Sequence, residues 1–111
     1  MRNLLQRKSV IKVNEFLHKI NNNFKLIVLD QTARTASDAS KALNKETGSI
    51  IKSLLFKNPE QNEYYLCLVS GDRYLSINKL AKIVGYKIIK ANADECKKFT
   101  GFSIGGVSPF A

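Results

Sequence analysis

Apolar residues recur at intervals of three and four in several stretches of the chain, a spacing that predicts amphipathic helices. The first helix is predicted for residues 9–21, with Ser9 as its N-cap. A short second helix is expected after Thr35, which is followed three positions later by an aspartate, as in a capping box. Two further helices are predicted over these ranges: residues 77–84, between Ser76 and Gly85, and residues 93–99, behind Asn92.

Continuous apolar runs bounded by turn residues predict four strands among these helices. The runs cover residues 24–29, 50–56, 64–70 and 87–90. A short polar turn containing Pro59 separates the second run from the third, so these two runs predict an antiparallel hairpin. Because two strands follow each other without an intervening helix, the element order argues against a doubly wound parallel sheet and predicts an α+β fold.

The composition is that of an ordinary globular domain. With 111 residues, 44% of them hydrophobic and 24% charged, the chain predicts a single domain over residues 1–111. No apolar run approaches the ~20 residues that span a bilayer, so we expect a soluble, cytoplasmic protein without membrane contact. Two cysteines, Cys67 and Cys96, and the single histidine, His18, are too few for a Cys/His zinc site. We therefore expect neither metal nor cofactor, and no disulfide framework.

The charge balance points to a polyanionic partner. Eighteen Lys and Arg residues against nine acids give a net charge of +9, the usual electrostatic signature of nucleic-acid binding. All but four of these cations are lysines, many of them isolated along the chain. A compositional bias toward Lys, Ile and Asn would produce the same excess, so charge alone favours nucleic acid while leaving both interpretations open.

Two features of the sequence could carry chemistry. Lys52 lies in the most hydrophobic strand, on one face with Leu54 and Phe56. It is either an edge lysine whose ammonium extends to water or an ammonium at the rim of an apolar pocket, positioned for a phosphate or carbonyl oxygen. The glycine-rich segment 101–109 is neither a P-loop nor a dinucleotide-binding motif. Its paired glycines could present consecutive backbone N–H groups to an anion, although a plain turn is the simpler explanation.

Four short motifs occur in an order typical of one known family. They are Thr32-Ala33-Arg34-Thr35-Ala36, Ile50-Ile51-Lys52-Ser53-Leu54, Ser70-Gly71-Asp72, and Thr100-Gly101-Phe102 followed by Gly105-Gly106-Val107-Ser108-Pro109. Over residues 10–109 the chain resembles the YbaK/EbsC family, which includes the editing domain inserted in bacterial prolyl-tRNA synthetases and its free-standing relatives. The resemblance implies hydrolysis of the ester that joins a wrong amino acid to tRNA. It also implies an α+β fold whose curved, mixed, mainly antiparallel sheet is partly barrel-like and flanked by helices.

The resemblance further implies roles for individual residues. Lys52 matches the family's functional lysine, which contacts the 3′ end of the tRNA, and together with Gly106 it forms the expected catalytic centre. Expected substrate-binding residues are Thr32, Arg34 and Thr35 at the pocket mouth, Gly71, and Gly105, Val107, Ser108 and Pro109 of the Gly-x-x-x-Pro loop that holds the aminoacyl group. No side-chain general base is evident, so the ribose hydroxyl of the substrate or backbone groups would activate the water.

Family members continue beyond the Gly-x-x-x-Pro loop through further strands and a helix, so we expect the C-terminal part of the family fold to be missing here. The predicted function is a trans-acting aminoacyl-tRNA deacylase, a carboxylic ester hydrolase of translation proofreading. The alternatives are a non-catalytic tRNA- or synthetase-associated binding module and an inactive truncated family member. The candidate partners are an aminoacylated tRNA, an aminoacyl-tRNA synthetase and a second copy of the chain covering an open sheet edge.

Overall fold

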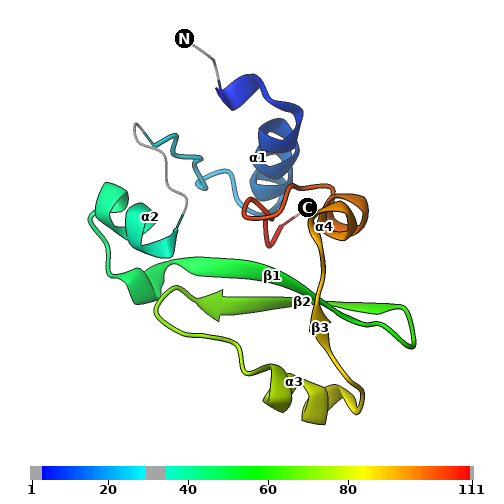
Figure 1. Ribbon diagram of the computed structural model, residues 1–111. Coiled ribbons are helices and arrows are strands. Elements are labelled where there is room, and N and C mark those ends of the chain that lie inside the picture. The colour runs from blue at the N-terminus through cyan, green and yellow to red at the C-terminus, as the bar shows by residue number, and fades with distance from the viewer. Residues whose placement is uncertain (1–3, 30–34, 111) are drawn as a thin grey trace.

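The computed structural model describes residues 4–29 and 35–110 of the chain (Figure 1). The elements in chain order are η1 (Leu4–Gln6), α1 (Lys8–Ile20), α2 (Ala36–Leu43), η2 (Thr47–Ser49), β1 (Ile51–Asn58), β2 (Glu63–Ser70), α3 (Ile77–Val84), β3 (Ile89–Lys90) and α4 (Ala93–Thr100). The described strands form one open antiparallel sheet in the order β2-β1-β3. The predicted α+β class is therefore confirmed.

The predicted hairpin is the centre of the sheet. Strands β1 and β2 pair along their whole length, from Ile51 opposite Ser70 to the turn that joins them. Asn58 begins this turn and is fully buried, and its side-chain oxygen accepts the backbone N–H groups of the two turn residues Glu60 and Gln61. Strand β3 pairs with β1 over only two residues at the turn end, so among the described residues no strand pairs with this edge of the other half of β1, which is called the free edge below.

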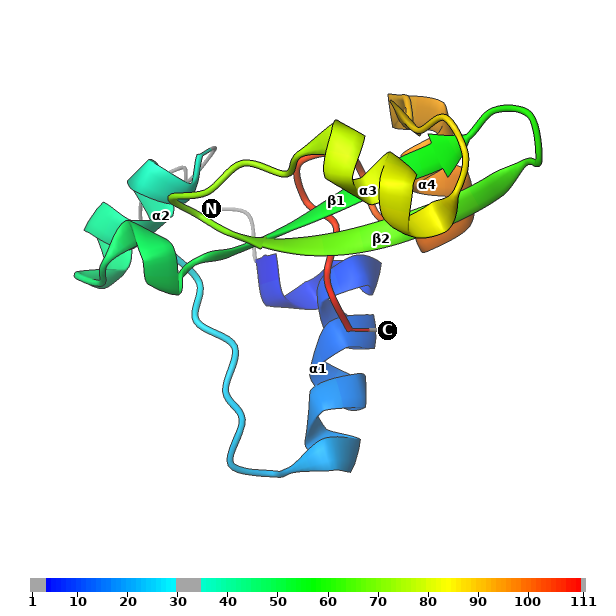
Figure 2. The same ribbon diagram turned by 90° about the horizontal axis from the view of Figure 1, so that it is seen from below.

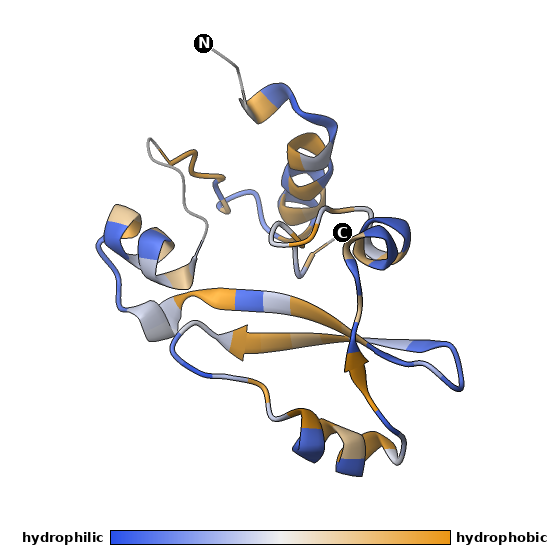
Figure 3. Cartoon of the chain, viewed as in Figure 1, coloured by the Kyte–Doolittle hydropathy of each residue, from blue (hydrophilic) through white to orange (hydrophobic). Residues whose placement is uncertain are grey.

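Helices cover both faces of the sheet. Helices α1 and α4 and the C-terminal loop lie on one face and α3 on the other, while α2 lies beyond the start of β1 (Figures 1 and 2). Apolar residues are frequent along β1 and β2 and recur on parts of α1 and α3 (Figure 3). The buried hydrophobic residues are Leu55, Phe56, Val69, Ile88, Ala91, Cys96 and Phe102. The core is therefore concentrated around the middle of the sheet and the start of α4.

Three predicted N-caps are confirmed, and their side chains determine where α2, α3 and α4 begin. Each cap accepts the backbone N–H of the residue three positions later: Thr35 from Asp38 at 3.0 Å, Ser76 from Lys79 at 3.2 Å, and Asn92 from Glu95 at 2.8 Å. Glu95 in turn accepts the Asn92 N–H at 2.9 Å, which completes a capping box. Helix α3 ends at Gly85, in the left-handed conformation that favours glycine.

Two predictions for the N-terminal part of the chain are wrong. Helix α1 begins at Lys8, before the expected cap Ser9, and Arg7 is its N-cap without a side-chain hydrogen bond. Residues 24–29 form no strand, although their composition is that of one. A strand requires a neighbour that pairs with its backbone, and none of the described strands pairs with this segment. Ile27 consequently remains 71% exposed.

Candidate functional site

A cavity of about 610 Å³ lies beside the half of β1 that β3 does not cover. Its wall includes successive residues of β1 together with residues from both faces of the sheet. The main contributing segments are the start of α2 (Thr35 to Ser37), β1 (Ile51 to Leu55), the loop after β2 (Gly71 and Tyr74), the β3–α4 junction (Lys90 and Ala91) and the C-terminal loop (Ile104, Gly105 and Val107), and single residues such as Thr47 and Cys96 add to the wall. At this cavity, four segments that lie far apart in the sequence therefore meet the first residues of the central strand β1.

The free edge of β1 presents backbone groups to this cavity. The Leu55 carbonyl accepts the Ala91 N–H on the β3 side, at 3.0 Å, whereas the Ile50 carbonyl accepts the Gly71 N–H on the β2 side, at 2.7 Å. Backbone groups alternate in direction along a strand, so the N–H and C=O groups of Ile51 and Ser53 point to the side on which β3 has ended. These groups can therefore hydrogen-bond to a bound molecule.

Lys52 lies at the rim of the cavity, and the protein holds its ammonium in place. Its Nζ donates a hydrogen bond to the Arg73 carbonyl at 2.7 Å and lies 5.1 Å from the centre of the Tyr74 ring. An ammonium has three donors, so two N–H groups stay available to a ligand. The Lys52 side chain is half-buried and is among the residues that line the cavity.

The C-terminal glycine loop reaches the cavity with only part of its length. Gly105, at a φ of +80°, and Val107 line the wall. The Gly106 N–H donates to the Ser103 carbonyl at 2.9 Å and closes a turn, so it is not available to an anion in this conformation. Ser108 and Pro109 are not part of the wall, and Ser108 Oγ accepts the N–H of a later loop residue. The expected row of consecutive N–H donors is therefore incomplete.

The other expected binding residues have different positions. Gly71 lines the cavity, but its lack of a side chain has a steric reason: an added Cβ would lie 2.4 Å from the Thr47 carbonyl oxygen and 2.8 Å from the Ala36 Cβ. Thr35 lines the wall and caps α2. Thr32 and Arg34 lie outside the described residues.

Sequence reasoning missed two residues of the site, Ser53 and Tyr74. Ser53 Oγ is buried and has no hydrogen-bond partner among the described residues, although the residue lines the cavity. Tyr74 also lines it and is 94% exposed. For Ser53 the available signal was a hydroxyl residue in the most apolar strand, next to Lys52. For Tyr74 it was an aromatic residue inside an otherwise polar turn.

A charged cluster joins the start of α4 to the β1–β2 hairpin. Glu95 accepts hydrogen bonds from Lys57 Nζ at 2.6 Å and from the Tyr64 hydroxyl at 2.7 Å. The backbone N–H of Asn92 and these two donors hold the pKa of Glu95 at about 2. The cluster ties the start of α4, and with it the cavity residue Cys96, to the β1–β2 hairpin.

The thiols and metal-binding side chains suggest no second centre in the described part of the chain. Cys67 and Cys96 are free, and burial raises the pKa of the Cys67 thiol, which disfavours a nucleophilic thiolate at neutral pH. Among residues 4–29 and 35–110, no three His, Cys, Asp or Glu side chains gather in a metal-binding arrangement. None of the described helices is long and apolar enough to cross a membrane.

Comparison with solved structures identifies matches that cover most of this chain. One match, at 36% identity and a TM-score of 0.83, is a candidate trans-editing enzyme for prolyl-tRNA synthetase, with 93% of this chain and 65% of that chain covered. A scaffold protein used for the computational grafting of linear epitopes matches at 32% identity and a TM-score of 0.84, covering 94% and 66%. A hypothetical protein matches at 28% identity and a TM-score of 0.78, covering 88% and 65%. The chain thus spans just under two thirds of each of these structures.

The family model of the aminoacyl-tRNA editing domain matches residues 30–111. No curated protein matches the chain. The matched range contains β1 with Lys52 and Ser53, the loop after β2 and the C-terminal glycine loop, which are the segments that build the cavity. The resemblance seen in four sequence motifs is confirmed by this match and by the structural neighbours: the chain belongs to the family of aminoacyl-tRNA editing domains.

Proposed function

We propose that the chain hydrolyses the ester bond of mischarged aminoacyl-tRNA in trans, as a deacylase of translation proofreading. The editing family supports a proofreading role, and one structural neighbour is a candidate trans-editing enzyme. The observation that carries the proposal is the cavity itself. Within one hollow of about 610 Å³ it combines a tethered ammonium, the free edge of β1, and a buried hydroxyl that has no partner in the described part of the chain.

Lys52 supplies the positive charge of the site. The 3′ end of a tRNA carries a phosphate close to the ribose that holds the amino acid, and both the phosphate and the ester carbonyl oxygen attract an ammonium. Because Lys52 Nζ is already bonded to the Arg73 carbonyl, it is positioned before the substrate arrives. A preorganised charge stabilises the developing oxyanion more than a freely moving one, since little reorganisation is needed during the reaction.

Ser53 and the edge of β1 orient the aminoacyl group. A buried hydroxyl without a partner is unfavourable in the free protein, and a substrate carbonyl or amino group would satisfy it. The outward-pointing backbone groups of Ile51 and Ser53 offer further donors and acceptors at the same edge. Gly105 and Val107 also line the cavity, where they would limit the size of the accepted side chain.

Water is the nucleophile in this scheme. No Asp, Glu or His is among the described residues of the cavity wall. A hydroxyl of the terminal ribose or a backbone carbonyl therefore orients the water, whose oxygen attacks the ester carbon. The bond from that carbon to the ribose oxygen breaks, and the ribose oxygen takes up the proton released by the water. The chain contributes charge and orientation rather than a basic side chain.

The partners follow from the same proposal. The net charge of +9 suits an aminoacylated tRNA, and the substrate would be met in the cytoplasm, where a synthetase releases it. If the charge serves RNA contact, the logarithm of the affinity should fall with the logarithm of salt concentration, by about 0.7 per phosphate contact on a single strand. A flat response would favour compositional bias instead. A second copy of the chain at the open sheet edge is a further candidate partner.

The experiment that tests the function measures the release of amino acid from tRNAs mischarged with Ala, Cys, Ser, Thr or Pro. Hydrolysis of at least one of these esters above the spontaneous rate is expected. A tRNA gel shift without release would support the second candidate, a binding module. That alternative is favoured by one observation, the net charge of +9, which suits contact with tRNA whether or not an ester is hydrolysed.

A further inference from the structure

Tyr74 is more exposed than the other three tyrosines, Tyr64, Tyr65 and Tyr86. Its side chain is 94% exposed, whereas Tyr64 stacks on Phe99 at 4.0 Å and Tyr65 bonds to a glutamate. No hydrogen bond of the Tyr74 hydroxyl is found among the described residues. A ring this exposed adds almost nothing to the core, so the folding of the chain gives no reason for an aromatic residue here.

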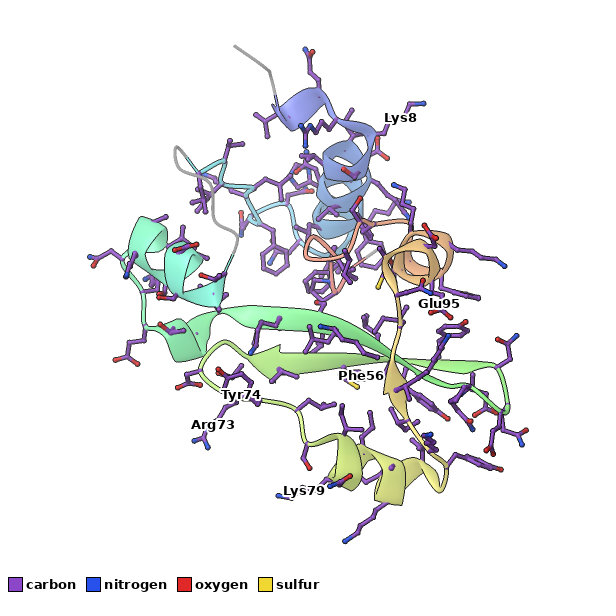
Figure 4. All side chains as sticks on the ribbon, viewed as in Figure 1. Lys8, Phe56, Arg73, Tyr74, Lys79 and Glu95 are labelled. Atoms are coloured by element: carbon purple, nitrogen blue, oxygen red, sulfur yellow. The ribbon has the colours of Figure 1, made fainter. Side chains whose placement is uncertain are left out.

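The ring lies at the rim of the cavity and beside its charge. Lys52 Nζ is 5.1 Å from the ring centre and is held there by the carbonyl of the neighbouring residue, Arg73. Arg73 and Tyr74 extend from the loop at the end of β2, on the same side of the sheet as Lys79 of α3 (Figure 4). The Arg73 side chain is 82% exposed. Arg73 Nε is 4.0 Å from Asp72 Oδ1, so Lys52 is the cation that faces the ring. Proteins bind the bases of single-stranded nucleic acids with exposed aromatic rings beside such cations.

We propose that Tyr74 is the stacking platform for the terminal base of the RNA whose ester enters the cavity. This inference rests on the proposed function, because it assumes an aminoacylated 3′ end. In such a substrate the reacting ester and the terminal base are attached to the same ribose, so a base must lie within one nucleotide of the Lys52 ammonium. Tyr74 lines the cavity, and its exposed ring lies 5.1 Å from the Lys52 ammonium, close enough to contact that base. Stacking tolerates any base, so this contact positions the substrate without reading its sequence.

The test is a cycle that removes the ring and the base separately and together. The probes are two short RNA hairpins with an unpaired 3′ end, each carrying an amide-linked amino acid that cannot be hydrolysed. One has a terminal adenine and the other an abasic ribose at that position. For the unmodified chain, loss of the base should weaken binding by about 5- to 150-fold. For Tyr74→Ala this ratio should fall close to one, while Tyr74→Phe, which keeps the ring, should retain it.

Tyr86→Ala is the matched control, because Tyr86 is partly exposed and is not among the residues that line the cavity. It should keep the ratio of the unmodified chain. A second readout uses Tyr74→Trp: the chain has no tryptophan, so this residue would be a unique fluorophore. Its emission should be quenched by the adenine hairpin and much less by the abasic one.

The outcomes separate this inference from the proposed function. If the unmodified chain binds and deacylates but Tyr74→Ala keeps the full base dependence, stacking is refuted and deacylation stands. Equal binding of both hairpins by the unmodified chain would refute stacking as well. If neither hairpin binds and no mischarged tRNA is hydrolysed, the proposed function and this inference both fail.

Discussion

Ser53→Ala should make the protein more stable and less active. In the free chain the Ser53 hydroxyl is buried without a partner among the described residues, and such a group costs about 1–3 kcal/mol. Alanine removes this cost and leaves a space no larger than one oxygen atom. The lower strand propensity of alanine offsets part of the gain, so a net stabilisation of about 1 kcal/mol is expected. For a domain of this size that raises the melting temperature by about 4 °C.

The same substitution should reduce deacylation, because the hydroxyl would no longer contact the substrate. Loss of one neutral hydrogen bond, worth about 0.5–1.5 kcal/mol, corresponds to a decrease in kcat/KM of up to about tenfold. Thermal unfolding followed by circular dichroism measures the first effect, and release of amino acid from mischarged tRNA measures the second. Ser53→Thr keeps the hydroxyl and should retain more activity than the alanine variant.

Ser49→Ala is the matched control, because Ser49 is exposed in η2 and is not among the residues that line the cavity. It should change stability by less than about 0.5 kcal/mol and leave activity intact. A lower melting temperature for Ser53→Ala would show that the hydroxyl has a structural partner and would refute the reasoning. A stabilised variant with unchanged kcat/KM would refute the substrate contact.

Three further substitutions probe the charge, the fold and the pH dependence. Lys52→Ala should lower the rate of deacylation by about 10²–10³-fold with little change in melting temperature. Its control is Lys82→Ala, at an exposed position of α3, which should behave as the unmodified chain. Equal rates for the two variants would contradict the role of Lys52. Gly71→Ala should destabilise the protein by about 1–3 kcal/mol in urea, because its Cβ would meet a backbone oxygen at 2.4 Å, and an unchanged midpoint would contradict this steric role. Glu95 has a pKa of about 2 in the folded chain against 4.5 ordinarily, so its contribution to stability is present above pH 4.5 and is lost as the pH falls toward 2. The free energy of unfolding, measured across this pH range, should depend less on pH in Glu95→Gln than in the control Glu60→Gln. Equal slopes of unfolding free energy against pH for the two variants would be inconsistent with the assigned pKa of Glu95.

The sequence predicted the elements whose local signals agree with their tertiary contacts. Thr35, Ser76 and Asn92 each cap the expected helix, because capping depends only on neighbouring residues. The hairpin was predictable for a similar reason, since a short turn joins two apolar runs. Residues 24–29 show the limit of such reasoning: their composition is that of a strand, but strand formation depends on a partner, which composition does not reveal.

The site was less predictable than the fold. The family motifs pointed to Lys52, Gly71 and the C-terminal loop, and the cavity includes residues from each. Motifs could not show that the Gly106 N–H is used within its own turn, because this depends on the loop's conformation. They also gave no role to Ser53 or Tyr74. The importance of these two comes from burial and exposure, which exist only once the chain has folded.

The most direct test of the central claim is single-turnover hydrolysis of mischarged tRNA by the unmodified chain and by Lys52→Ala at matched concentrations. Each ester of the Ala, Cys, Ser, Thr and Pro panel is followed beside its spontaneous hydrolysis. We predict that the unmodified chain accelerates at least one of these reactions and that Lys52→Ala loses about 10²–10³ of that acceleration. Hydrolysis at the spontaneous rate for every ester, in a chain that is folded and binds tRNA, would contradict the assignment of a deacylase.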